Sequence, residues 1–154
     1  MQKYRKIYEK IGLIRCIYCD IDLKEQITHL DHFLPWSHLP INKFWNLYPS
    51  CQSCNSKKKD RIPHVSEELV LKLKQHLMDC VQAAKEKEEI FILEDIQNLY
   101  HNSFNSPELT PDKNQMVEEI FDYLLSLRNE LLSILPGKQY DFPIVKQKLQ
   151  EIKK

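Results

Sequence analysis

The chain has 154 residues, 42% of them hydrophobic, which is enough to bury a core and excludes a chain that is disordered throughout. No apolar run approaches the roughly 20 residues of a membrane-spanning helix, and the N-terminal MQKYRKIYEKIG is followed by no apolar segment of the kind found in signal peptides. We therefore expect a cytoplasmic protein without membrane contact, built as one domain or as a small module with an added helical part.

The formal net charge of zero hides a division along the chain. Residues 1–64 contain 11 Lys and Arg against 6 Asp and Glu, a net charge of +5, whereas residues 65–154 contain 11 against 16, a net charge of −5. A basic module is typical of proteins that bind polyanions. Ordinary charge fluctuation is the alternative. The charges predict two parts, residues 1–64 and an acidic part at residues 65–154, with any polyanion binding in the first.

Helices are expected to dominate, because the chain has only two glycines, Gly12 and Gly137, and many-turned β folds need more. Residues 2–11 predict a short basic helix that ends near Gly12. Residues 13–64 are irregular, and the alternation in QITHLDHF is compatible with a short strand or hairpin.

Helical patterns fill the rest of the chain. Ser66 is a suitable N-cap for a long helix whose apolar residues recur at helical spacing, and Cys80 lies on its apolar stripe as a buried structural thiol. The third of the expected helices ends before Pro136–Gly137. The four helices are expected to start at Ser66, near residue 91 (to about 103), at Thr110–Pro111 and near Pro143.

Four of the five cysteines form two C-x-x-C pairs, Cys16-Ile17-Tyr18-Cys19 and Cys51-Gln52-Ser53-Cys54. Four thiolates in two tight pairs suit one tetrahedral Zn²⁺, because each pair lets both sulfurs reach one ion without backbone strain. A redox C-x-x-C is the rival interpretation, but it normally needs a βαβ context that this sequence lacks. The zinc would be structural, since residues 13–64 have few other ways to form a core. The residues between the two pairs must then form a substructure of their own.

Asp31 and His32 stand side by side in LDHFLPW, between apolar neighbours. An acid in such a segment is costly unless a cation or a hydrogen-bond donor compensates for it. Asn46 precedes the second cysteine pair, and Asn55 directly follows its last cysteine. Phosphodiester hydrolysis needs a metal ion to stabilise charge and a base to deprotonate water. His32 suits the base, and the oxygens of Asp31 and Asn55 suit Mg²⁺ or Mn²⁺. Capping of turns or of a helix is the alternative for the two asparagines.

The order Asp-His, Asn, Cys-x-x-Cys-Asn and then lysine resembles the HNH endonucleases, also called ββα-metal nucleases, over roughly residues 13–63. The resemblance implies a small zinc-stabilised ββα-metal module, and with the helical C-terminal region that the caps and apolar spacing predict, the expected fold class is α+β, mainly α. It implies that His32 is the general base, that Asp31 and Asn55 bind the catalytic metal and that Asn46 fixes the active-site loop. It also implies hydrolysis of nucleic acid, DNA above all, to a 5′-phosphate and a 3′-hydroxyl. The last motif position holds asparagine in place of histidine, a variation known in the family that leaves the preferred metal open.

Basic residues follow the motif at the start of an expected helix, where their side chains can reach backbone phosphates. A solvated charged face is the rival interpretation. The two tryptophans, Trp36 and Trp45, are expected to pack around the zinc module rather than to stack on bases, since each lies in an apolar stretch. The basic residues are Lys57, Lys58, Lys59 and Arg61.

A zinc-stabilised nucleic-acid-binding module without catalysis is the alternative function, because cysteine pairs and a basic patch suffice for binding. Residues 65–154 contain no catalytic constellation, and their acidic helices suit docking of a protein partner or self-association. Small HNH proteins of this kind are similar to effectors of bacterial anti-phage systems, sometimes paired with an ATPase subunit.

Overall fold

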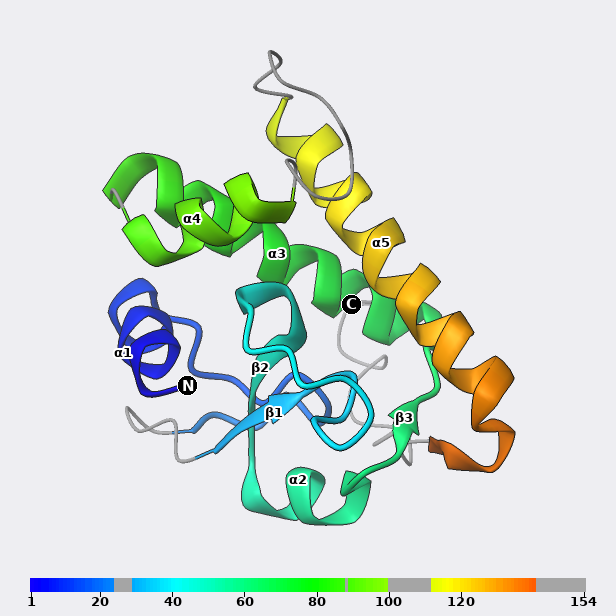
Figure 1. Ribbon diagram of the computed structural model, residues 1–154. Helices are drawn as coiled ribbons and strands as arrows, with labels where there is room; N and C mark the ends of the chain where they lie inside the picture. Colours follow the sequence, from blue (N-terminus) through cyan, green and yellow to red (C-terminus); the bar gives the residue numbers. More distant parts are fainter. Residues whose placement is uncertain (24–28, 88, 100–111, 141–154) are drawn as a thin grey trace, which may run out of the picture.

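The computed structural model describes residues 1–23, 29–87, 89–99 and 112–140. A small ββα unit near the N-terminal end is followed by three further helices (Figure 1). The architecture is α+β with helices in the majority, which confirms the expected fold class.

The ββα unit occupies the interval between and after the two cysteine pairs. Its two strands pair antiparallel, with Asp31 opposite Tyr48. The Sγ of Cys51 caps the following helix by accepting a hydrogen bond from the backbone N–H of Cys54 at 3.4 Å. The substructure that the long interval required is therefore a hairpin. The elements in chain order are β1 (His29–His32), the 3-10 helix η1 (Phe44–Asn46), β2 (Leu47–Ser50) and α2 (Gln52–Lys58).

Helix α1 (Gln2–Ile11) packs against the entry of the second strand. It ends where Gly12 adopts a left-handed conformation, φ 83°, which glycine reaches without steric cost. The buried Tyr8 hydroxyl hydrogen-bonds to the carbonyls of Phe44 and Leu47, at 3.1 and 3.0 Å. The basic helix predicted at residues 2–11 is confirmed, and it holds η1 and β2 in place.

Side-chain caps mark the starts of the first and the last helix of the helical part. The backbone N–H of Leu69 donates to Ser66 Oγ at 3.3 Å, which confirms Ser66 as the first cap. Asp112 caps the last helix through the N–H of Asn114 at 3.2 Å, whereas the predicted cap, Thr110, lies outside the described residues. The three helices are α3 (Glu67–Lys87), α4 (Ile90–Leu99) and α5 (Lys113–Ile134).

After α5 the chain returns to the ββα unit. The 3-10 helix η3 (Pro136–Lys138) leads into β4 (Gln139–Tyr140), which pairs in parallel with β3 (Ile62–Pro63). Arg128 of α5 reinforces this junction by donating from Nε to the carbonyl of Pro63 at 2.8 Å. The end of the helical part is therefore fastened close to the end of α2 (Figure 1).

One apolar cluster joins α1, the ββα unit and the three later helices. Trp45 belongs to it, with its ring nearly perpendicular to that of Tyr123 on α5 at 5.5 Å between centroids. The expectation that both tryptophans pack around the zinc module is met by Trp45, which is buried in this cluster with residues of the ββα unit, and not by Trp36, which is 48% exposed. The boundary after residue 64 stays a prediction.

Two predicted features lie outside the described residues: the helix expected from Pro143 and the end of the second helix beyond Leu99. Among the helices that are described, none is both long enough and apolar enough to cross a membrane.

Candidate functional site

The four paired cysteines meet at one point. Their Sγ atoms all lie within 4.8 Å of one another, and the Sγ atoms of Cys19 and Cys51 are 3.8 Å apart. Four ligands at the usual Zn–S distance of about 2.3 Å, arranged as a tetrahedron, have edges of about 3.8 Å. The donor set and its spacing therefore fit one structural Zn²⁺ held by Cys16, Cys19, Cys51 and Cys54.

The pKa values of the clustered thiols are shifted by burial and by hydrogen bonds within the cluster. Burial raises the pKa of Cys16 to about 11 and also raises that of Cys54. At Cys51 burial acts in the same direction, but hydrogen bonds from Cys54 and the neighbouring thiols outweigh it, and the pKa is lowered. Burial disfavours the negative charge of the thiolates, and a bound Zn²⁺ would supply the positive charge that stabilises the deprotonated sulfurs.

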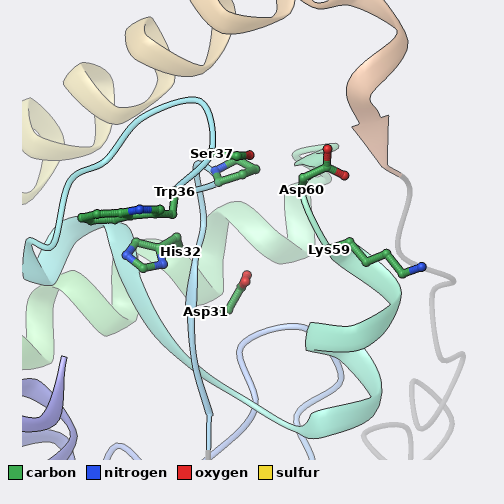
Figure 2. Close-up of a pocket in the computed structure, with 7 residues that line it drawn as sticks. Asp31, His32, Trp36, Ser37, Lys59 and Asp60 are labelled. Atoms are coloured by element: carbon green, nitrogen blue, oxygen red, sulfur yellow. The ribbon is translucent and has the colours of Figure 1, made fainter.

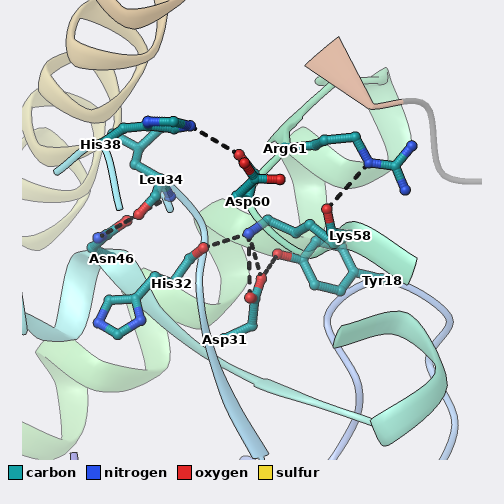
Figure 3. Close-up of polar contacts among 9 residues, drawn as sticks. All are labelled: Tyr18, Asp31, His32, Leu34, His38, Asn46, Lys58, Asp60 and Arg61. Atoms are coloured by element: carbon teal, nitrogen blue, oxygen red, sulfur yellow. Dashed lines mark hydrogen bonds and ion pairs between the residues drawn. The ribbon is translucent and has the colours of Figure 1, made fainter. Parts of the chain in front are cut away.

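Asp31 is compensated, as an acid in an apolar segment must be, and the structure shows how. The side chain is 5% exposed, and both carboxylate oxygens face the ammonium of Lys58, at 3.0 and 3.2 Å (Figure 3). The Tyr18 hydroxyl donates to the same carboxylate. Lys58 is itself fully buried and also donates to the carbonyl of His32 at 2.6 Å. An internal cation and a hydroxyl therefore hold this acid in place.

The pKa values of this group follow from its burial. Burial raises the pKa of Asp31, and the opposing charge of Lys58 and the hydrogen bond from Tyr18 offset that effect. Burial lowers the pKa of Lys58, and Asp31 offsets this in turn. Burial and the charge of Asp31 also raise the pKa of Tyr18 well above its ordinary value, so this hydroxyl remains a donor. Each charge is tolerated only because the other is present.

His32 is held in one orientation. Its Nε2 lies 2.8 Å from Oδ1 of Asn42, and because an amide oxygen only accepts, Nε2 carries the ring proton. Nδ1 is then the unprotonated nitrogen, which is the state that a base needs. Tyr4 of α1 donates to the Asn42 carbonyl at 3.2 Å, and Asp95 of α4 accepts hydrogen bonds from Tyr4, from the Lys43 ammonium and from the Phe44 N–H.

Asn46 fixes the connection between the two strands. Its Oδ1 accepts from the N–H of Leu34 at 2.8 Å, and its Nδ2 donates to the carbonyls of Leu34 and Ile41 at 3.1 and 3.2 Å (Figure 3). The side chain is fully buried. These contacts tie both ends of the segment between Leu34 and Ile41 together, which is the kind of role that the resemblance implies for Asn46.

Asp31 and His32 line one cavity of about 200 Å³ (Figure 2). Asn55 lies one turn before Lys58 on α2 and is partly exposed, but it is not among the described residues that line this cavity. The structure thus brings the predicted base and the predicted acid together in one lining, and the role of Asn55 as a metal ligand stays a prediction. The lining residues are Asp31, His32, Pro35, Trp36, Ser37, Lys59 and Asp60.

The four basic residues after the second cysteine pair differ in exposure: one is buried and the others are partly or fully exposed. Lys58 does not match the predicted phosphate contact, because it is buried and paired with Asp31. Arg61 is partly exposed, donates to the carbonyls of Lys57 and Lys58, and lies over the Tyr140 ring at 3.7 Å. Lys57 and Lys59 are exposed, and Lys59 lines the cavity. Of the four predicted phosphate contacts, Lys57 and Lys59 are the exposed ones, and their contact with phosphate stays a prediction.

Sequence reasoning missed three residues that touch the site: Tyr18, Asn42 and the inward-facing Lys58. Helical spacing was a usable signal for Lys58, because it stands four residues after Cys54 and so shares a face with that predicted ligand. Tyr18 lies inside the first cysteine pair, where only the contacts of the folded chain reveal its direction. Asn42 is ten residues from His32, and no local pattern links the two.

Residues 16–61 match the HNH endonuclease family. The chain is also similar to the Septu protein PtuB of Bacillus thuringiensis, with 37% identity over 62 residues that cover 34% of this chain and 24% of that protein. The chain thus spans about a quarter of the length of this curated relative. No solved structure matches the chain significantly. The segment of residues 16–61, with its ββα topology and its four-cysteine cluster, is therefore similar to the HNH endonuclease family.

Proposed function

We propose that the protein is a metal-dependent endonuclease that hydrolyses phosphodiester bonds of nucleic acid, DNA in the first place. The observation that carries the proposal is the orientation of His32. Its Nε2 is held by Asn42 at 2.8 Å, and its ring lines the same cavity as the carboxylate of Asp31. A fixed imidazole with one free nitrogen beside a buried acid is an arrangement suited to deprotonating water.

In this proposal His32 takes a proton from water at Nδ1. The hydrogen bond to Asn42 keeps the other nitrogen protonated and stabilises the imidazolium that forms, because the amide oxygen continues to accept from Nε2. Lys58 holds the carbonyl of the same histidine, so the backbone as well as the ring is fixed. Positioning of this kind lowers the entropic cost of reaching the reactive geometry.

Asp31 and Asn55 are the proposed ligands of Mg²⁺ or Mn²⁺, since carboxylate and amide oxygens are the ligands these ions prefer. A bound divalent ion supplies charge stabilisation at the phosphate and at the leaving oxygen. The Asp31 carboxylate has acceptor sites beyond those used by Lys58 and Tyr18 and lines the cavity, so it fits this role. Because Lys58 already balances its charge, we expect the metal to bind weakly until a substrate phosphate adds a further ligand.

The biological setting is also part of the proposal. We propose a cytoplasmic effector of bacterial anti-phage defence that works with a protein partner, such as an ATPase subunit, or by self-association through residues 65–154. The similarity to the Septu protein PtuB supports this setting. The acidic composition of residues 65–154 favours a protein partner over nucleic acid on that part.

Cleavage of supercoiled plasmid tests the proposal. Zinc-loaded wild type should nick it with Mg²⁺ or Mn²⁺, and His32→Ala should lower the rate by about 100-fold or more, within the usual range for a general base. End-group analysis should find a 5′-phosphate. His64→Ala is the matched control, because His64 is exposed and is not among the described residues of the cavity lining.

Zinc content, measured in each protein, separates loss of chemistry from loss of fold. If His32→Ala nicks as fast as His64→Ala at equal zinc, the assignment of the base is wrong. If zinc-loaded wild type binds nucleic acid but cleaves neither duplex nor single strands, alone or with its native partner, the alternative of a non-catalytic binding module is correct.

A further inference from the structure

Trp36 is an exposed aromatic ring at the cavity that contains His32. It is 48% exposed, whereas Trp45, the other tryptophan of the chain, is 4% exposed. Its ring lies 5.3 Å from that of His32, between centroids, and the planes are tilted by 53° (Figure 2). The ring therefore offers an open aromatic face in the cavity, next to the candidate base, which a flat ligand can cover.

The ring is presented by a fixed backbone. The carbonyl of Pro35 accepts hydrogen bonds from the N–H groups of His38 and Leu39, both at 2.9 Å, which closes a tight turn around Trp36. Asn46 ties together Leu34 and Ile41 on either side of this turn. The backbone that carries the ring is therefore set before any ligand arrives, so no backbone entropy of this turn is lost on binding.

The charges of the cavity suit a polyanion. The two acids in its lining already have partners inside the protein, Asp31 with Lys58 and Asp60 with Lys138 at 2.6 Å. Lys59 is exposed in the same lining. An aromatic ring and an exposed cation in the lining of one cavity form the combination with which proteins bind single-stranded nucleic acid.

The size of the cavity limits the size of the group that it can hold. Its volume of about 200 Å³ is below the roughly 300–1,000 Å³ of pockets for drug-sized ligands, so it takes a group the size of one base or one sugar-phosphate. In a regular duplex each base face is covered by its neighbours. Only an unpaired or splayed base offers a free face to a protein ring.

We propose that Trp36 is a stacking platform for an unpaired nucleobase next to the scissile phosphate, so that the substrate is single-stranded or locally unpaired nucleic acid. This inference rests on the proposed nuclease function, because the phosphate beside the stacked base is the one that His32 addresses. It names the substrate class of that site.

Binding without cleavage tests the proposal. Zinc-loaded protein, with no Mg²⁺ or Mn²⁺ added, is titrated with a single-stranded oligonucleotide and with the duplex of the same sequence. The single strand should quench the tryptophan fluorescence that Trp36→Phe lacks. Trp36→Ala should weaken single-strand binding by about 5- to 100-fold, the usual range for loss of one stacked base, and change duplex binding less than twofold. Trp36→Phe should restore most of the affinity.

Lys59→Ala is the matched control from the same cavity. It should weaken binding to single strand and duplex alike and reduce the salt dependence, because a phosphate contact does not distinguish the two. The proposal is overturned if Trp36→Ala weakens binding to single strand and duplex equally or leaves single-strand binding unchanged. It is also overturned if the single strand does not quench the fluorescence of Trp36. The same titrations with DNA and with RNA oligonucleotides of one sequence show which of the two nucleic acids the protein prefers.

Failure of the proposed function gives a different result. If the protein stacks a base on Trp36 but cleaves nothing when Mg²⁺ is added, the stacking proposal is correct and the nuclease proposal is wrong. If the protein nicks plasmid through His32 but Trp36→Ala leaves single-strand binding unchanged, the nuclease proposal is correct and the stacking proposal is wrong.

Discussion

Asp31 and Lys58 form a buried ion pair in which neither charge is tolerated alone. The requirement for a compensating group near Asp31 follows from the apolar neighbours in LDHFLPW. The identity of that group does not, because the sequence offers several lysines and a predicted metal ion as candidates. Only the fold shows that Lys58 faces inward, with the carboxylate at 3.0 Å, while Lys57 and Lys59 face solvent.

Removing one member of this pair should destabilise the protein strongly. We expect Lys58→Met to lower the free energy of unfolding by about 3–5 kcal/mol, because it leaves the Asp31 carboxylate buried without a counter-charge. Denaturant unfolding of zinc-loaded protein measures this. The double variant Asp31→Asn with Lys58→Met should lose clearly less than the sum of the two single variants, and strict additivity would contradict the pairing.

Asn42 positions His32, and its loss should affect rate more than fold. Without the acceptor at 2.8 Å the imidazole can rotate and change tautomer, so we expect Asn42→Ala to lower the cleavage rate by about 10- to 100-fold. Zinc content and the melting temperature should stay close to wild type. Asn98→Ala, an exposed asparagine of α4, is the control. An unchanged cleavage rate in Asn42→Ala would show that the ring is oriented by something else.

The elements of the ββα unit are joined by the cysteine cluster. The first pair carries Tyr18 to the carboxylate of Asp31, and the second pair caps α2, which carries Lys58 to the same carboxylate. The cluster therefore positions two of the groups that hold the predicted acid. Spacing alone predicted the four ligands, since two C-x-x-C pairs suit one ion, but the link from the cluster to Asp31 depends on side-chain directions that spacing does not encode.

Zinc removal should consequently disorder the site and not only the cysteines. We expect a strong chelator to unfold residues 13–23 and α2, because site formation contributes on the order of 10–16 kcal/mol in small zinc peptides. Hydrogen exchange before and after chelation measures this, and cleavage should return only with Zn²⁺ and Mg²⁺ together. Cys51→Ser should reproduce the loss and Cys80→Ser should not, since Cys80 lies in the core away from the cluster. Full protection of α2 in metal-free protein would contradict this scaffold role.

The helices of residues 65–154 were predictable where caps and apolar spacing agree. Ser66 starts the pattern of α3, and its stripe of leucines is buried as expected. Trp36 was not predictable, because apolar neighbours in a sequence do not tell whether a ring faces the core or a cavity. The turn after Pro35 decides this, and it depends on Asn46, which is distant in sequence.

At the scale of the whole molecule, the charge division does not correspond to two separate cores. The basic and acidic parts share one apolar cluster, and the acidic part reaches the cavity through the ion pair of Lys138 with Asp60. Asp95 of α4 also holds the segment that carries Asn42. Contacts of this kind join residues that are 50 or more positions apart, and no local pattern predicts them. These contacts connect the helical part with the segments that form the cavity.

Acid should weaken the shared core through His76. This histidine is packed between the rings of Tyr8 and Tyr48, and burial lowers its pKa from 6.5 to about 3. Between these values the unfolded chain binds a proton that the folded protein does not, so the free energy of unfolding falls as pH falls, by about 2 kcal/mol from pH 7 to pH 5. Denaturant unfolding at both pH values should show this loss in wild type and a loss smaller by that amount in His76→Gln. Equal losses in the two proteins would contradict the buried, neutral histidine.

If His32 activates water in a metal-dependent nuclease, added imidazole should replace its missing side chain. Plasmid nicking by His32→Gly is measured with Mg²⁺ at fixed zinc content, with and without added imidazole. We expect nicking to be lost in His32→Gly and partly restored by imidazole, in proportion to the concentration of unprotonated imidazole, whereas the rate of wild type should not change. If His32→Gly nicks at the wild-type rate without imidazole, His32 is not the base.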